Sequence, residues 1–122
     1  MARRIASGIG INASICASPC RPCREAAAAA TDEPLWELPL EQRYRRELDS
    51  TVADLRNLGG ANAGAITAAL FLAEFVGDTP WAHVDIAGTA QSNGDSGWDT
   101  DGCTGFGARL LIRLALDFSA TP

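Results

Sequence analysis

The stretch AGAITAALFLAEFVGDTPWAHVDIAG, residues 63–88, decides the fold because it holds a helix, a turn and a strand in direct succession. Residues 63–76 are apolar on almost every side, which predicts a helix buried all round. Gly77 is suited to end that helix. After the turn at DTP, residues 81–88 predict a buried strand. This succession indicates an α/β layered structure.

The segments upstream alternate in the same way. EAAAAA, residues 25–30, predicts a helix that TDEP ends, because a residue before proline avoids the helical region. LWELPL, residues 35–40, predicts a short strand. Pro39 then lies near the start of a helix that EQRYRRELD continues. Residues 51–58, TVADLRNL, alternate in part and predict a short extended segment.

The downstream segments complete the pattern. Residues 89–103 predict a long polar loop, and TGFGARLLIRLALDF, residues 104–118, predicts the last helix. Leu110, Leu114 and Phe118 would lie on one face of this helix, with Arg109 and Arg113 on the other. Two or three strands make an incomplete sheet, so the helix at 63–76 is expected to need partners that the chain does not contain.

The N-terminal part differs in composition. Residues 2–11 predict one short strand, whereas residues 12–24, NASICASPCRPCR, show neither a helical nor a strand period. The first 24 residues carry four arginines and no acidic residue, and the remainder carries six arginines and all fifteen acidic residues. We therefore predict an irregular N-terminal segment at 1–24, followed by the main portion at 25–122.

Length and charge bound the function. A chain of 122 residues is one small domain or part of a larger one. Its net charge of −5 argues against non-specific nucleic-acid binding, and no apolar run approaches the roughly 18–20 residues of a membrane span. The apolar region after Arg3 and Arg4 makes a poor secretory signal, so we predict a cytoplasmic location. All ten cationic residues are arginine, so no step can use a lysine.

The cysteines allow three interpretations. Cys16, Cys20 and Cys23 have metal-ligand spacing, with Cys103 and His83 far along the chain. This is only half of a structural zinc site, because a second close pair is missing. A disulfide is disfavoured in a cytosolic chain. We favour incidental composition, and a small zinc-binding protein stays an alternative.

Two polar features also allow functional and structural interpretations. His83 and Asp85 lie two residues apart, so their side chains would share one face of a strand. They could form an acid–base or metal-binding pair. We prefer the structural interpretation, in which a buried hydrogen bond joins them. Asp95, Asp99 and Asp101 lack the full calcium-loop pattern, so a solvated loop is preferred.

The glycine-rich turn NLGGANAGA, residues 57–65, opens the central helix and could bind an anion at its N-terminus. It matches neither the Walker pattern nor GxGxxG. Close backbone packing is the better explanation.

Several motifs together resemble the leucyl (cytosol) aminopeptidase family. They are LWELPL with the tyrosine and leucine that follow, VADLRNLGG with AGAITAALFLAEFV, WAHVDIAGTA, and TGFGARLL. The resemblance covers residues 25–118 in unbroken order, and ARRIASGIG weakly resembles the strand upstream in the family. It implies that this chain corresponds to the C-terminal part of the catalytic domain, an incomplete three-layer α/β fragment.

The resemblance also implies a chemistry. Family members use two divalent metals (zinc, manganese or magnesium) to release N-terminal residues from peptides, and their active form is a homohexamer. Their metal ligands, which are acidic residues and one lysine, and a second lysine and an arginine that assist catalysis lie upstream of the matching region. Several of them are in an NTDAEGR-type segment, which this chain lacks; Arg109 is not that arginine. We therefore expect no metal bound, and no hydrolysis, by this chain alone.

The resemblance implies that this chain keeps residues that line the substrate pocket in the family. Ala87 and Ala90 match positions lining the pocket for the substrate's N-terminal side chain, and Leu58 matches one beyond the scissile bond. Small residues at 87 and 90 leave room for a leucine-sized group. The alternative is a non-catalytic assembly module that binds intact aminopeptidase subunits.

Overall fold

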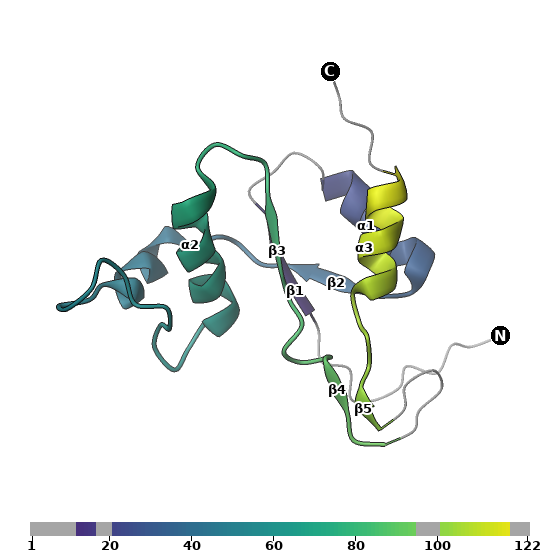
Figure 1. Cartoon of the computed structure of the whole chain (residues 1–122). Helices are drawn as coiled ribbons and strands as arrows, with labels where there is room; N and C mark the ends of the chain where they lie inside the picture. The colour runs from purple at the N-terminus through teal and green to yellow at the C-terminus, as the bar shows by residue number, and fades with distance from the viewer. Residues whose placement is uncertain (1–11, 17–20, 95–100, 118–122) are drawn as a thin grey trace. The chain divides into compact units, whose positions relative to one another are not determined.

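The computed structural model describes residues 12–16, 21–94 and 101–117 (Figure 1). Its elements, in chain order, are β1 (Asn12–Cys16), α1 (Arg21–Thr31), β2 (Leu35–Glu37), the 3-10 helix η1 (Gln42–Leu48), α2 (Gly64–Val76), β3 (Ala82–Asp85), β4 (Gln91–Ser92), β5 (Gly102–Cys103) and α3 (Ala108–Asp117). Backbone contacts group them into two compact units. The α1–α3 unit also contains β4 and β5, and the α2–β3 unit also contains β1 and η1.

The main sheet has three strands in the order β2-β1-β3. β1 runs antiparallel to β3, in a register that pairs Ala13 with Asp85 and Cys16 with Ala82. The predicted strand at 81–88 is therefore confirmed, although it ends at Asp85. The predicted strand at 35–40 is confirmed as the shorter β2.

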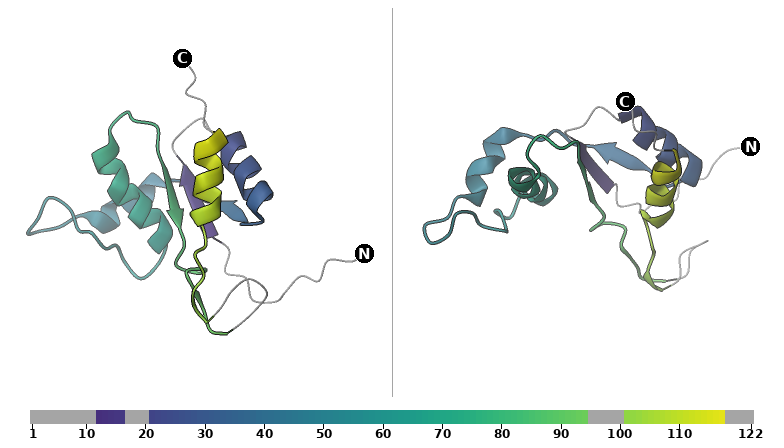
Figure 2. Two further views of the ribbon diagram at one scale, coloured as in Figure 1. Left: turned by 45° about the vertical axis from the view of Figure 1, so that its right-hand side comes forward. Right: turned by 45° about the horizontal axis from the view of Figure 1, so that its top comes forward.

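The α1–α3 unit has a small core where two helices meet. Ala27 and Ala28 of α1 and Leu110 of α3 are buried together, and Leu35 and Leu114 pack against them. Figure 2 shows α1 and α3 side by side in both views. Alanine side chains on α1 let the leucines of α3 approach its backbone closely, which gives a dense contact from few atoms. Phe118, expected on the same face, lies outside the described residues.

The α2–β3 unit is built on the contact between α2 and η1 (Figure 2). Leu48 of η1 and Leu70 of α2 are almost completely buried. Arg45 of η1 reaches across to form an ion pair with Glu74 of α2. The prediction that α2 is buried all round is wrong within this chain, since Phe75 is 69% exposed.

Four further expectations are corrected by the structure. Residues 12–16 form the strand β1 and residues 21–24 form the first turn of α1, so these parts of the segment are not irregular. The helix after Pro39 is a 3-10 helix, and residues 51–58 form bends with no strand pairing. The polar segment 89–103 contains a second two-stranded sheet, in which Gln91 pairs with Cys103. Backbone pairing across the chain, which local periodicity does not report, accounts for the strands at both places.

Candidate functional site

The turn that follows β3 carries two of the predicted site residues. The carbonyl oxygen of Ile86 accepts hydrogen bonds from the backbone N–H of Thr89, at 2.9 Å, and of Ala90, at 2.8 Å. Ala87 is exposed and Ala90 is half-buried. The turn thus carries both alanines within the α1–α3 unit, and each contributes only a methyl group as its side chain.

The C-terminal end of this turn is held by Thr104, just after β5. Its backbone N–H donates to the carbonyl oxygen of Ala90 at 3.1 Å. Its hydroxyl donates to the carbonyl oxygen of Thr89 at 2.5 Å and accepts from the N–H of Phe106 at 3.1 Å. Thr104 therefore joins the turn to the segment that leads into α3.

The start of α3 is held in turn by the carboxylate of Glu33. Asp32 adopts a left-handed conformation, with φ 56°, and so ends α1; the N–H of Glu33 then donates to Ala28. The buried Glu33 carboxylate accepts from the N–H of Gly107, at 3.1 Å, and of Leu110, at 2.7 Å. It satisfies N–H groups that the first turn of a helix leaves free, where a negative charge is favoured.

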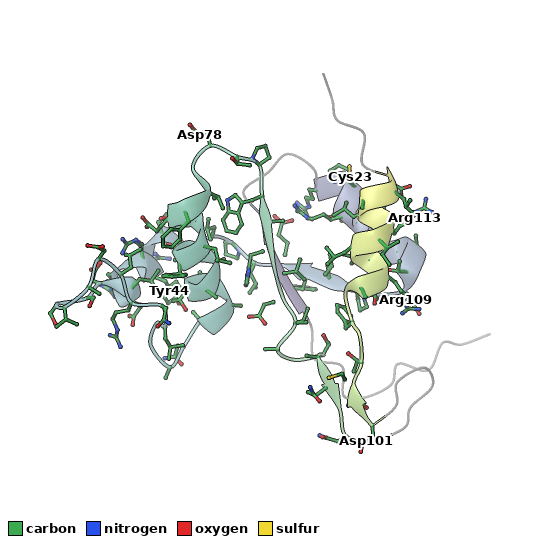
Figure 3. All side chains as sticks on the ribbon, viewed as in Figure 1. Cys23, Tyr44, Asp78, Asp101, Arg109 and Arg113 are labelled. Carbon is green, nitrogen blue, oxygen red and sulfur yellow. The ribbon has the colours of Figure 1, made fainter. Side chains whose placement is uncertain are left out.

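The two arginines of α3 form ion pairs with nearby acids. Figure 3 shows Arg109 and Arg113 on one side of the helix. The guanidinium Nε of Arg109 lies 3.7 Å from the Glu33 carboxylate, and that of Arg113 lies 2.6 Å from Asp117. Both arginines pair with nearby acids, which is a structural role.

The third predicted site residue, Leu58, lies in the other unit. Its side chain is 75% exposed, at the edge of an open depression of about 660 Å³. The lining combines the phenyl rings of Phe71 and Phe75 with the polar side chains of Asp54 and Arg56. The structure thus places Leu58 at the rim of an open, partly apolar depression within the α2–β3 unit.

The other polar candidates do not form a reactive site among the described residues. His83 lies on β3 opposite Ile15, and its Nε2 atom is buried without a hydrogen-bond partner, so the expected bond to Asp85 is not made through this atom. Asp101 is exposed beside β5 (Figure 3), while Asp95 and Asp99 lie outside the described residues.

The cysteines also differ from expectation. Cys23 is disulfide-bonded, which corrects our preference against a disulfide and removes this sulfur as a thiolate ligand for zinc. Cys103 is a free, exposed thiol that accepts from the side-chain amide of Gln91 at 3.4 Å. Cys20 lies outside the described residues.

Comparison with known proteins decides the family. The sequence profile described as the cytosol aminopeptidase family, catalytic domain, matches residues 4–112. The chain belongs to the cytosol aminopeptidase family. A probable cytosol aminopeptidase of Desulforapulum autotrophicum is 50% identical over 93 residues, which are 75% of this chain and 18% of that protein. One from Synechococcus sp. is 51% identical over 90 residues. This chain thus spans under a fifth of the length of the curated relatives it matches.

Solved aminopeptidase structures confirm the predicted fold class. Cytosol aminopeptidase from Coxiella burnetii has a TM-score of 0.76 and 40% identity, over 95% of this chain and 26% of that one. A tomato leucine aminopeptidase mutant has a TM-score of 0.78 and 34% identity, over 93% and 22%. The bottromycin maturation enzyme BotP in complex with Mn has a TM-score of 0.80 and 37% identity. The mixed helix-and-strand fragment therefore matches part of an aminopeptidase catalytic domain.

The residues described here do not fit the metal centre that the aminopeptidase family implies. No three histidine, cysteine or acidic side chains gather closely enough to hold an ion within 12–16, 21–94 and 101–117. A two-metal site needs such a set of ligands for each ion. We therefore derive no catalytic step through a metal from this part of the chain. The helices of the described part are also too short or too polar to cross a membrane.

Two residues of the site escaped sequence reasoning. Thr104 was predicted to start the last helix, and Glu33 was seen only as part of the end of α1. Their partners lie 15 and 74 to 77 residues away in sequence. A Ser or Thr before a helix is a general sign of side-chain bonding to backbone, and TGFG carries that sign. Nothing local to Glu33 identifies its partner.

Proposed function

We propose that this chain contributes a substrate-pocket wall to a metal-dependent aminopeptidase that releases N-terminal residues from peptides. The observation that carries the proposal is the ordered turn with Ala87 and Ala90, in a chain that belongs to the cytosol aminopeptidase family. In this proposal residues 25–122 are the C-terminal portion of the catalytic domain. The methyl groups at 87 and 90 leave space for a leucine-sized side chain.

Leu58 takes a related role in the proposal. Its exposed side chain and the neighbouring Phe71 and Phe75 offer apolar surface to the substrate residue beyond the scissile bond. Peptides with a free N-terminus are the proposed substrates of the assembled enzyme. The naming of the relatives as cytosol aminopeptidases supports a cytoplasmic location.

The 122 residues alone are proposed to be inactive. The chain contains no lysine, and its described residues gather no metal-binding cluster. The test is to incubate the purified chain with Mn²⁺ or Zn²⁺ and a leucyl chromogenic substrate, with a full-length family member as positive control. We expect no turnover above the no-protein blank. Turnover that a chelator abolishes would refute the proposed inactivity.

A second candidate is a non-catalytic module that binds intact aminopeptidase subunits. It is favoured by the outer face of α3, where Leu111, Ile112 and Leu116 are between 56% and 77% exposed. A contiguous apolar face of this kind marks a surface that another protein covers. The test is co-purification of the tagged chain with a full-length relative. A complex that survives gel filtration supports this candidate, whereas separate elution of both proteins contradicts it.

A further inference from the structure

We propose that Thr104 is the residue that positions the Ile86–Ala90 turn and, through it, the methyl groups of Ala87 and Ala90. The proposal rests on the proposed function only in taking this turn as a pocket wall. Thr104 does not line the wall itself. It would set the shape of the wall through the backbone, which makes it a positioning residue.

The turn has two ends, which are held differently. The N-terminal end is closed by the Ile86 carbonyl, which accepts from Thr89 and Ala90 within the turn. At the C-terminal end, the carbonyl groups of Thr89 and Ala90 both receive their hydrogen bonds from Thr104. The hydroxyl and the backbone N–H of Thr104 therefore orient two successive carbonyl groups of the turn, so a change at Thr104 should alter both.

The orientation of the Thr104 hydroxyl is itself determined. A hydroxyl has one proton to donate and lone pairs with which to accept. Here the proton is directed to Thr89 and a lone pair receives the N–H of Phe106. Because threonine is branched at Cβ, few rotamers place the hydroxyl between these two groups, and the methyl group restricts the choice further.

The segment that follows Thr104 is itself held in place by hydrogen bonds. Gly107 and Leu110 are bonded to the buried Glu33 carboxylate, so the start of α3 is tied to the end of α1. A Cβ atom built on Gly107 would lie 4.0 Å from the Cγ2 atom of Ile86, which places the start of α3 in ordinary contact range of the turn's first residue. The segment that leads into α3 therefore lies close to the first residue of the turn and is hydrogen-bonded to its last two residues.

The chemistry offers a matched pair of variants. Thr104→Val keeps the branched shape but removes the hydroxyl, which leaves the Thr89 carbonyl and the Phe106 N–H without this partner. Thr104→Ser keeps the hydroxyl and loses only a methyl group. Loss of one hydrogen bond of this kind raises local opening about five- to tenfold, whereas a retained hydroxyl should hold the turn.

The decisive experiment is amide hydrogen exchange by NMR on the full chain. In Thr104→Val we expect the amides of Phe106 and Ala90 to exchange about five- to tenfold faster, and in Thr104→Ser less than about twofold faster. The amide of Leu111, bonded to Gly107 within α3, should stay unchanged. If the Ala90 amide of Thr104→Val exchanges at an unchanged rate, Thr104 does not position the turn. If the exchange of Leu111 rises equally, Thr104 only stabilises the unit as a whole. Either result would overturn the proposal.

A second measurement separates this proposal from the proposed function. Titration with L-leucine amide should shift the methyl signals of Ala87 and Ala90 in the unaltered chain and in Thr104→Ser. The apparent affinity for L-leucine amide should fall about threefold or more in Thr104→Val, because the turn adopts its binding-competent conformation in a smaller fraction of the molecules. Equal affinity in Thr104→Val would overturn the link to the pocket. No shift in the unaltered chain would count against the pocket wall itself, while the exchange data still decide the positioning role.

Discussion

Gly59 is a residue at which a single methyl group has no room. A Cβ atom built there would lie 2.9 Å from the Cβ, Cγ2 and Oγ1 atoms of Thr67, which is buried on α2 and hydrogen-bonded to Gly64. Gly59→Ala is therefore expected to lower the free energy of unfolding by about 1–3 kcal/mol. Urea denaturation followed by circular dichroism measures this change.

The control for that change is Gly64→Ala. Apart from its chain neighbours and the backbone of its own helix, nothing lies within 4 Å of a Cβ built on Gly64, the first residue of α2. Alanine there reduces the freedom of the unfolded chain, so we expect stability unchanged or raised by up to about 1 kcal/mol. Equal effects of the two substitutions would refute the steric explanation.

Glu41 gives a pH-dependent prediction. Its carboxylate accepts from the side chain of Arg43 at 3.0 Å and from the Arg43 backbone N–H at 3.1 Å, and these bonds, the side-chain bond first, lower the pKa of Glu41. Because the folded pKa is depressed, the interaction stabilises the start of η1 above the ordinary glutamate pKa and is lost as pH falls through the depressed value. The effect on stability is small, since the pair is exposed.

An NMR titration tests this assignment. The Glu41 carboxyl group should titrate below the usual glutamate range in the unaltered chain. In Arg43→Ala its pKa should rise part of the way, because the backbone N–H at position 43 remains. A pKa that does not move in this variant would contradict the role of the guanidinium group.

At the scale of elements, Glu33 links the end of α1 to the start of α3. Glu33→Gln removes the charge next to two helix N–H groups, and Glu33→Ala removes both acceptors. We expect Glu33→Ala to destabilise the α1–α3 unit by about 1–3 kcal/mol, and Glu33→Gln by less. Thermal unfolding monitored at α3 amides by NMR reports the change.

Asp117→Asn is the matched control for Glu33. Asp117 is also an acid paired with an arginine, but its ion pair with Arg113 is exposed on one helix face. Such pairs contribute about 0.3–0.5 kcal/mol. If Asp117→Asn lowers the stability of the α1–α3 unit as much as the Glu33 substitutions do, burial and helix capping do not explain the contribution of Glu33.

For the whole molecule, the outer face of α3 predicts self-association. Leu111, Ile112 and Leu116 expose large apolar side chains on a single short helix. We expect sedimentation velocity to show oligomers that grow with concentration, because burial of this face is favourable. Ile112→Lys with Leu116→Lys should shift the distribution to monomer.

Val52→Lys is the comparison for this effect. Val52 is 94% exposed in the segment between η1 and α2, away from any helix face. A single exposed apolar residue is ordinary, so this substitution should leave the distribution unchanged. Oligomers that persist in the α3 double variant would contradict the assignment.

The sequence by itself determined the elements whose signals are local. The apolar run at 63–76, the alanine run of α1 and the motif WAHVDIAG predicted α2, α1 and β3. The motifs VADLRNLGG and WAHVDIAGTA helped to indicate the family and gave the positions Leu58, Ala87 and Ala90. These signals are readable because hydrophobic period and helix propensity act over neighbouring residues.

Only the tertiary structure decided the pairings between distant segments. Residues 10 to 77 positions apart are joined in β1, in the β4–β5 sheet, in the Glu33 bonds to α3 and in the Thr104 bonds to the turn. A hydrogen bond between such partners leaves no periodic mark on either segment, because its geometry is set by how the chain returns on itself. The alanines of the proposed pocket wall were therefore visible in the sequence, whereas the residue that positions them was not.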